Sequence, residues 1–351
     1  MSATTGIHDG HATTHVGELI EVGEIDRSNY EATGTPPIAV LYENSEWMEE
    51  LFDALDRRGL VYEPINLADG ALLPDDPGDY ALVINRVSPS AAIRGNGSAI
   101  AQTRRWLNTL ERRGTRVING ADAFRVETSK VVQDKLIRGL GLTTPKTVVL
   151  RKQEAFDDLI EDFPFPAILK PDTGGSGAGV RFVGSLSHLD RLLDEEPDIF
   201  GPDEVMVLQE FITSADGSIM RTEFVGDELL FAMRVQPLNT FNLCPADGCI
   251  RAPADGEGEA GALFEYQEGI PAEMVEEARA ILRAAGLDFG GVEYIEARDG
   301  RRYYYDINAT SVYRSDIVAA SGIDAMDRLV SFIEREAAQT YATRSGQSRA
   351  A

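Results

Sequence analysis

The chain has 351 residues, more than one compact core usually holds, so two or three domains are expected. Its net charge of -25, from 33 basic and 58 acidic residues, argues against nucleic acid as a partner, because phosphate backbones attract a basic surface. No segment approaches the roughly 18 consecutive apolar residues of a membrane helix, and the first residues lack the basic start and apolar run of a secretory signal. We therefore expect a cytoplasmic protein that does not act at a membrane.

Residues 1–36 are polar, which predicts a disordered tail, with a short appended helix or strand as the alternative. The two cysteines, Cys244 and Cys249, lack the second pair that a zinc site needs, and a disulfide is not expected in the cytoplasm. Cys244 has no histidine near it in the sequence, so we interpret it as a small buried residue rather than a nucleophile.

The segment 37–124 alternates strands and helices. Its apolar start, from Pro37 to Asn44, predicts a buried strand, and a helix follows between Ser45, a suitable N-cap, and Gly59. Further strands are predicted at 60–67, 79–87 and 116–120, and a helix at 98–113. Strand–helix–strand units with short connections are typical of a small parallel α/β domain.

From residue 125 the pattern changes to helices mixed with antiparallel hairpins, which is typical of an α+β domain. Helices are predicted at 129–141, 272–286 and 324–338. Strands are predicted at 144–150, 165–171, 179–184 and 204–212, and hairpins at 219–236 and 290–308. We place this second domain at 125–337 and a polar tail at 338–351.

A glycine-rich loop lies between two of these strands. Its glycines, Gly174, Gly175, Gly177 and Gly179, would let backbone N–H groups point toward one phosphate. Lys170 ends the preceding apolar strand, where a buried cation needs an anionic partner. The segment is not a Walker A motif, because no Gly-Lys-Ser/Thr opens a helix here. We interpret it as a triphosphate-binding loop, with a flexible turn as the alternative.

Three oxygen-bearing side chains belong to the last hairpin: Glu293 before its turn, and Asp306 and Asn308 after it. Asp306 and Asn308 leave the same face of their strand, and Glu293 can join them from the partner strand. Two carboxylates and an amide oxygen suit Mg²⁺. The alternative is a solvated acidic face in a very acidic chain.

Two weaker signals complete the set. The strand end Gln209-Glu210-Phe211-Ile212 could bind adenine through its main chain, although a plain buried strand is the simpler interpretation. Arg86 ends a strand of the first domain, where it would hold a substrate carboxylate or pair with an acidic neighbour.

In order and spacing these segments resemble the ATP-grasp superfamily, and within it the RimK-type or glutathione-synthetase-like ligases. The resemblance runs from Ile38 to Ala337. It is carried by Asp134-Lys135, Ile168-Leu169-Lys170-Pro171, the loop 174–180, Leu208 to Ile212, Gly291-Val292-Glu293 and Asp306-Ile307-Asn308. It implies an ATP-grasp fold preceded by an N-terminal α/β domain.

The resemblance also implies roles for residues. Lys135 and Lys170 would hold the α- and β-phosphates of ATP, and the loop with Ser176 would close over the γ-phosphate. Gln209, Glu210, Phe211 and Ile212 would bind adenine. Glu293, Asp306 and Asn308 would bind one or two Mg²⁺ ions, or Mn²⁺. Arg221 and Arg234 would face the transferring phosphoryl group, Asn242 would reach the acceptor substrate, and Asp216 is the candidate for the ribose.

The implied function is an ATP-dependent carboxylate–amine ligase that works through an acyl phosphate and releases ADP and phosphate. A carboxylate kinase on the same fold and an ATP-binding protein without turnover are the alternatives. The expected substrates are a small-molecule or peptide carboxylate and an amine, and a homodimer is the default assembly.

Overall fold

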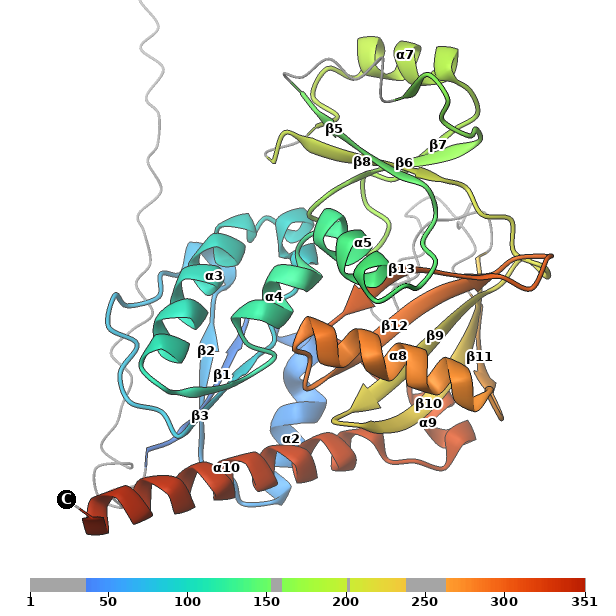
Figure 1. Cartoon of the computed structure of the whole chain (residues 1–351). Helices are drawn as coiled ribbons and strands as arrows, with labels where there is room; N and C mark the ends of the chain where they lie inside the picture. Colours follow the sequence, from blue (N-terminus) through green and yellow to red (C-terminus); the bar gives the residue numbers. More distant parts are fainter. Residues whose placement is uncertain (1–35, 153–159, 201–202, 238–262, 351) are drawn as a thin grey trace, which may run out of the picture.

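The structure is a computed structural model that describes residues 36–152, 160–200, 203–237 and 263–350. The described residues form two four-stranded sheets and one five-stranded sheet, with helices packed around them (Figure 1). The expectations for the N-terminal tail, the two cysteines and Asn242 fall outside the described residues.

The N-terminal sheet is parallel, with the strand order β2-β1-β3-β4. Its strands are β1 (Ile38–Tyr42), β2 (Tyr62–Asn66), β3 (Leu82–Asn85) and β4 (Arg116–Ile118). The intervening helices are η1 (Glu46–Met48), α2 (Glu49–Arg57), η2 (Ala68–Gly70), η3 (Pro89–Arg94) and α3 (Gly97–Arg112), and α4 (Ala121–Glu127) follows. Helices cover both faces, α3 on one and α2 on the other, so every residue of β1 and β3 is buried.

The central sheet is antiparallel, with the order β5-β8-β6-β7, and stands apart at the top of Figure 1. It comprises β5 (Thr147–Arg151), β6 (Ala167–Pro171), β7 (Arg181–Val183) and β8 (Val205–Glu210), with α7 (Leu186–Glu195) packed on one face. Helix α5 (Lys130–Gly139) connects this sheet to the N-terminal domain.

The C-terminal sheet is antiparallel, with the order β11-β10-β9-β12-β13. It comprises β9 (Ile219–Val225), β10 (Glu228–Gln236), β11 (Leu263–Gln267), β12 (Phe289–Glu296) and β13 (Arg302–Asn308). Helix α8 (Ala272–Ala285) covers one face, while α9 (Ser315–Ser321) and the start of α10 (Ala325–Ala350) pack on the other.

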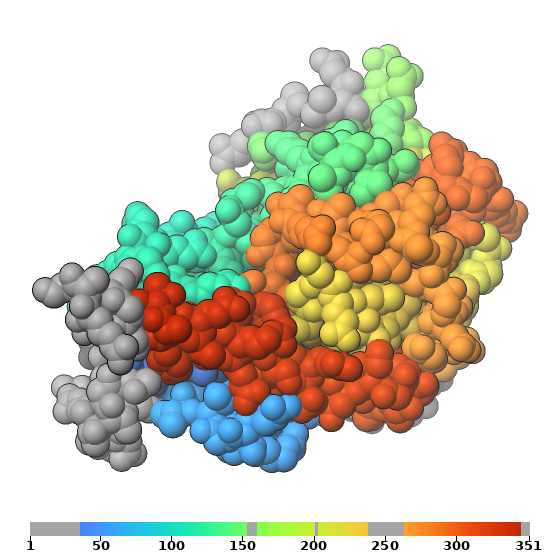
Figure 2. Space-filling view, turned by 60° about the horizontal axis from the view of Figure 1, so that its bottom comes forward, coloured from blue at the N-terminus to red at the C-terminus, as the bar shows by residue number. Residues whose placement is uncertain are grey.

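Helix α10 lies along both the C-terminal sheet and the N-terminal domain, as Figure 2 shows. Arg116 of β4 donates to Glu336 at 2.7 Å, Tyr341 donates to the carbonyl of Pro36 at 3.0 Å, and Arg344 donates to Asp79 at 2.8 Å. The expectation that the last helix stops near residue 337 and gives way to a polar tail is therefore wrong. Its polar residues continue the helix because they find partners on the N-terminal domain.

Within the described residues, none of the helices is long and apolar enough to span a bilayer.

Candidate active site

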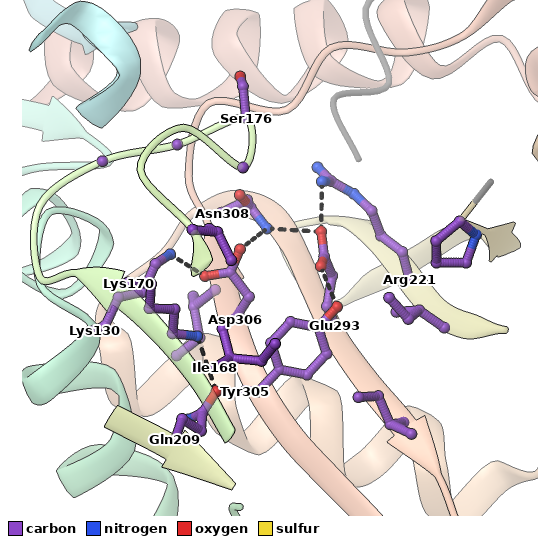
Figure 3. A pocket seen from close by; sticks show the side chains of 18 of the residues that line it. Lys130, Ile168, Lys170, Ser176, Gln209, Arg221, Glu293, Tyr305, Asp306 and Asn308 are labelled. Atoms are coloured by element: carbon purple, nitrogen blue, oxygen red, sulfur yellow. Dashed lines mark hydrogen bonds and ion pairs between the residues drawn. The ribbon is translucent and has the colours of Figure 1, made fainter. Parts of the chain in front are cut away.

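A cavity of about 710 Å³ lies where the three sheets meet. The N-terminal domain contributes Ser88, Pro89 and Ser90 to its wall, and the central sheet contributes the glycine-rich loop and the end of β8. The C-terminal sheet contributes Arg221, Glu293 and the end of β13 (Figure 3).

The glycine-rich loop connects β6 to β7, and Gly174, Gly175, Ser176 and Gly177 line the cavity. Gly179 does not line it, but its positive φ of 73° and that of 71° at Gly177 let the chain turn back. The base of the loop is fixed by Asp172, whose carboxylate accepts from the backbone N–H of Val131 at 2.8 Å, at the start of α5. The loop is thus anchored rather than free at its base.

Lys170, at the end of β6, points into the cavity. Its Nζ donates to Gln209 Oε1 at 2.9 Å and lies 5.6 Å from the centre of the Tyr305 ring. Burial, followed by repulsion from Lys130, lowers the pKa of Lys170 to about 8, although Asp306 opposes the shift. This part of the cavity therefore favours an anionic ligand, which would stabilise both ammonium groups.

The second lysine of the cavity is Lys130 rather than Lys135. Lys130 lines the cavity and contacts Asp306, whereas Lys135 is exposed on the surface of α5 and does not line it. Five helical positions turn the side chain by about 140°, so the two lysines leave the helix in different directions. The structure therefore does not place Lys135 in the cavity, and the lysine that α5 contributes to its lining is Lys130.

The strand end 209–212 lines the cavity next to β6, which carries Lys170. Gln209 joins Lys170 to Thr147, since its Nε2 donates to Thr147 Oγ1 at 3.1 Å. The ring of Phe211 packs edge-on against Phe182 at 5.4 Å, and both rings remain partly exposed. Phe182, Phe211 and Ile212 give the cavity an apolar lining beside the strand end, which suits a flat heterocycle.

Glu293, Asp306 and Asn308 come together on the floor of the cavity. Asn308 Nδ2 lies 3.4 Å from both Glu293 Oε1 and Asp306 Oδ2, and Tyr305 donates its hydroxyl to Glu293 Oε2 at 2.7 Å (Figure 3). Burial, and then the nearby charge of Asp306, raises the pKa of Glu293. A cation between the two carboxylates would relieve that repulsion.

This convergence depends on a β-bulge. Glu296 pairs with Arg302 and Tyr294 with Tyr304, but Glu293 pairs with Asp306, so Tyr305 is an extra residue in β13. If the ladder were regular and Tyr305 paired with Glu293, Asp306 would stand on the opposite face of the sheet from Glu293.

The donor set fits a hard divalent cation that also binds phosphate. It offers oxygens only, and half a turn of the Asn308 amide would present Oδ1 to the two carboxylates. No cluster of three or more His, Cys, Asp or Glu in the described parts of the chain could hold a metal. A metal here would therefore need the nucleotide phosphates to complete its shell.

Arg221 and Arg234 were expected to face one site, and the structure separates them. Arg221 lines the cavity, where its Nη1 donates to Glu293 at 3.0 Å. Arg234 lies in a second hollow of about 290 Å³, where it contacts Asp216 and donates to Ser218 Oγ at 2.8 Å. The structure therefore does not bring Arg234 and Asp216 into the cavity that Arg221 lines.

A second β-bulge explains this separation. A regular hairpin turning at Gly226-Asp227 would place Arg221 and Arg234 on one face of the sheet. In the structure the register shifts at Leu230, so that Arg221 pairs with Met233 and Arg234 with Met220. A shift of one residue moves a side chain to the other face of the sheet.

Arg86 is buried, 4% exposed, and does not line the cavity. Its Nη2 donates to the carbonyl of Ser311 at 2.8 Å, its guanidinium lies over the Phe289 ring, and Glu127 and Glu223 are near enough to stabilise its charge. Nε and Nη1 of Arg86 are buried without a hydrogen-bond partner among the described residues, so neither interpretation from the sequence is confirmed.

Sequence reasoning missed Glu127, which lines the cavity from the end of α4. Its Oε1 accepts from the backbone N–H groups of Ala309 and Thr310, both at 2.9 Å, and burial raises its pKa to about 7. The sequence signal for Glu127 was that a carboxylate directly follows the run Ala123-Phe124-Arg125-Val126. Glu127 thereby fixes the turn that follows Asp306 and Asn308 of β13.

A glycine-rich loop, two lysines and an acidic hairpin around one cavity define the ATP-grasp class of fold. A model of the RimK-like ATP-grasp domain matches residues 128–333, and the chain belongs to this family. The fold and family resemblance expected from the sequence are thereby confirmed.

The chain is also similar to individual proteins. A probable alpha-L-glutamate ligase of Xanthomonas campestris is 27% identical over 257 residues, which cover 73% of this chain and 79% of that one. A D-alanine–D-alanine ligase from Bacillus anthracis superposes with a TM-score of 0.62 at 17% identity, over 88% of this chain and 99% of that one. A RimK domain ATP-grasp protein from Sphaerobacter thermophilus gives 0.60 at 20% identity, over 84% and 98% of the chains.

Proposed function

We propose that this chain is an ATP-dependent ligase that activates a carboxylate as an acyl phosphate and joins it to an amine, with release of ADP and phosphate. The supporting observation is the arrangement of the cavity. Lys130 and Lys170 lie between the glycine-rich loop and the side chains of Glu293, Asp306 and Asn308, and Lys130 contacts Asp306. Cationic groups for phosphates and an oxygen donor set for a phosphate-bound cation thus meet in one place.

ATP would bind with its base between Phe211 and the apolar residues beside it, and with its phosphates between the two lysines and the loop. Glu293, Asp306 and Asn308 would hold Mg²⁺, which would neutralise charge on the transferring phosphoryl group. The number of ions and a role for Mn²⁺ remain predictions from the resemblance.

The substrate carboxylate would attack the γ-phosphorus with ADP as the leaving group, and Arg221 would stabilise the phosphoryl oxygens. An amine would then attack the carbonyl carbon, phosphate would leave, and the amine would lose a proton as the amide forms. The loop, anchored through Asp172, would keep water away from the acyl phosphate.

The relatives suggest the first substrates to test. The Xanthomonas protein is named a probable alpha-L-glutamate ligase, and the Bacillus protein a D-alanine–D-alanine ligase. We propose an amino acid or a peptide as one of the two substrates. The cytoplasmic location and the homodimer stay predictions from the sequence.

The test is to incubate the protein with ATP, Mg²⁺ and pooled amino acids and carboxylic acids, and to measure ADP, AMP and phosphate. ADP and phosphate that require both an acid and an amine, and that Lys170→Ala abolishes, would support the ligase. ADP from an acid alone would point to a carboxylate kinase. AMP with pyrophosphate would contradict the acyl-phosphate route.

A further inference from the structure

Glu223 is a fully buried carboxylate beneath the cavity, outside the set of residues that line it. It lies on β9 two residues after Arg221, so both side chains leave the same face of the sheet. Its Oε1 accepts from Arg221 Nε at 2.6 Å, and its Oε2 accepts from the hydroxyl of Ser311 at 2.5 Å. Both carboxylate oxygens are thus hydrogen-bonded, one of them to the arginine of the candidate site.

The neighbouring strand leaves room for this carboxylate. Gly291 of β12 pairs directly with Glu223, and a Cβ at position 291 would lie only 2.9 to 3.0 Å from the carboxylate atoms of Glu223. Real Cβ atoms rarely approach other atoms so closely. The buried acid and the glycine opposite it therefore fit together as a pair.

Arg221 lies between two carboxylates, Glu223 on one side and Glu293 on the other. Arg221 Nε lies 2.6 Å from Glu223 Oε1, whereas its Nη1 lies 3.0 Å from Glu293 Oε1. Glu223 is thus the nearer of the two partners.

The two partners differ in what a bound metal does to them. Glu293 belongs to the oxygen set that would hold Mg²⁺, so its charge would be shared with the ion. Arg221 would then lie beside a doubly charged cation, and Glu293 would neutralise less of the positive charge of the arginine. Glu223 lies behind Arg221, away from the cavity, and would keep its full charge.

From this arrangement we propose that Glu223 is a positioning residue, the permanent counter-ion that keeps Arg221 in place when a metal–nucleotide complex occupies the cavity. The proposal rests on the nucleotide site of the proposed function. Ser311 extends the chain of contacts, since its hydroxyl donates to Glu223 and its carbonyl accepts from Arg86 of the N-terminal domain. The position of Arg221 is thereby tied to the N-terminal domain as well.

The direct test is to compare crystals of the wild type and Glu223→Gln grown with Mg²⁺ and a non-hydrolysable ATP analogue. We expect Arg221 to keep its contact with residue 223 in the wild type and to leave that position in the variant. If Arg221 occupies the same position in both, the inference is overturned. A wild-type cavity that takes up no nucleotide would instead contradict the proposed function.

Kinetics provide the second test, once an active substrate pair is known. Glu223→Gln should lower kcat by about 10- to 100-fold, as loss of a residue that orients a site group does, while the KM for ATP changes little. In an Arg221→Ala background the same change should have no further effect. An equal loss in both backgrounds would mean that Glu223 acts on the fold rather than on Arg221.

Two more variants test whether a loss of kcat in Glu223→Gln reflects misfolding. Gly291→Ala should displace the Glu223 carboxylate without removing it. It should lower kcat as Glu223→Gln does, with no further loss in an Arg221→Ala background. Glu63→Gln is the matched control, because Glu63 is also a buried acid, bonded to Tyr80 at 2.9 Å, but lies on β2. A loss of kcat in Glu63→Gln as large as that in Glu223→Gln would overturn the inference.

Discussion

Lys130 and Asp306 form an ion pair on the floor of the cavity although 176 residues separate them in the chain. One residue begins helix α5 and the other belongs to β13, so the pair joins two elements that a nucleotide would also have to join. A metal bound to Asp306 would compete with the lysine, which would then be free to turn toward the phosphates.

Lys130→Ala should therefore weaken ATP binding by about tenfold or more, since a hydrogen bond to a charged group contributes about 1.5–3 kcal/mol. Titration calorimetry with Mg²⁺ and a non-hydrolysable analogue measures this. Lys135→Ala is the matched control from the exposed side of the same helix and should bind as the wild type does. Weaker ATP binding in Lys135→Ala than in Lys130→Ala would instead support Lys135 as the residue that binds the nucleotide.

Substitutions of the two arginines should also differ in their effect, here on kcat. Arg221→Ala should lower kcat by about 10²- to 10³-fold, because it removes a donor aimed at the developing charge. Arg234→Ala should leave kcat nearly unchanged, since Arg234 occupies the other face of the sheet. Steady-state assays of both variants check this, and a large loss of kcat in Arg234→Ala would contradict the assignment.

Lys170 should make ATP binding depend on pH. Its pKa in the unbound protein is lowered to about 8, so close to that pH about half of the molecules lack the ammonium charge. Anionic phosphates would raise this pKa again, so binding near pH 8 should take up a proton, and affinity should fall as the pH rises above 8. Calorimetry in buffers of different ionisation enthalpy measures the uptake, which should disappear in Lys170→Arg.

Gly175 of the glycine-rich loop lies close to Ser90 of the N-terminal domain. A Cβ at Gly175 would lie 3.0 Å from Cβ of Ser90. Gly175→Ala should force the loop away from Ser90 at a cost of about 1–3 kcal/mol, and weaken binding of the ATP analogue accordingly. Ser90→Gly in the same chain should restore part of that affinity, whereas no recovery would place the defect inside the loop itself.

The elements that carry the site could be predicted because their signals are local. The apolar strand before Lys170, the glycines after it and the alternating carboxylates at Asp306 and Asn308 each occupy one short segment. Lys130 and Lys135 could not be separated in this way, because both lie on one helix and only packing decides which side faces the cavity. Glu127 and Glu223 were missed because their partners are distant in the sequence, at Thr310 and Ser311.

The two extra residues in the hairpins, Leu230 and Tyr305, set which side chains face the cavity because they bulge out of the strand pairing. If Tyr305 paired with Glu293 in a regular ladder, Asp306 and Asn308 would turn away from Glu293. If Leu230 paired with Glu223, Arg234 would turn toward the face that carries Arg221. Deletion of either extra residue would instead leave Asp306 paired with Glu293 and Arg234 paired with Met220. In these two hairpins a gap of one position in an alignment therefore does not by itself move a side chain to the other face, and relatives should be matched by strand register before their residues are compared.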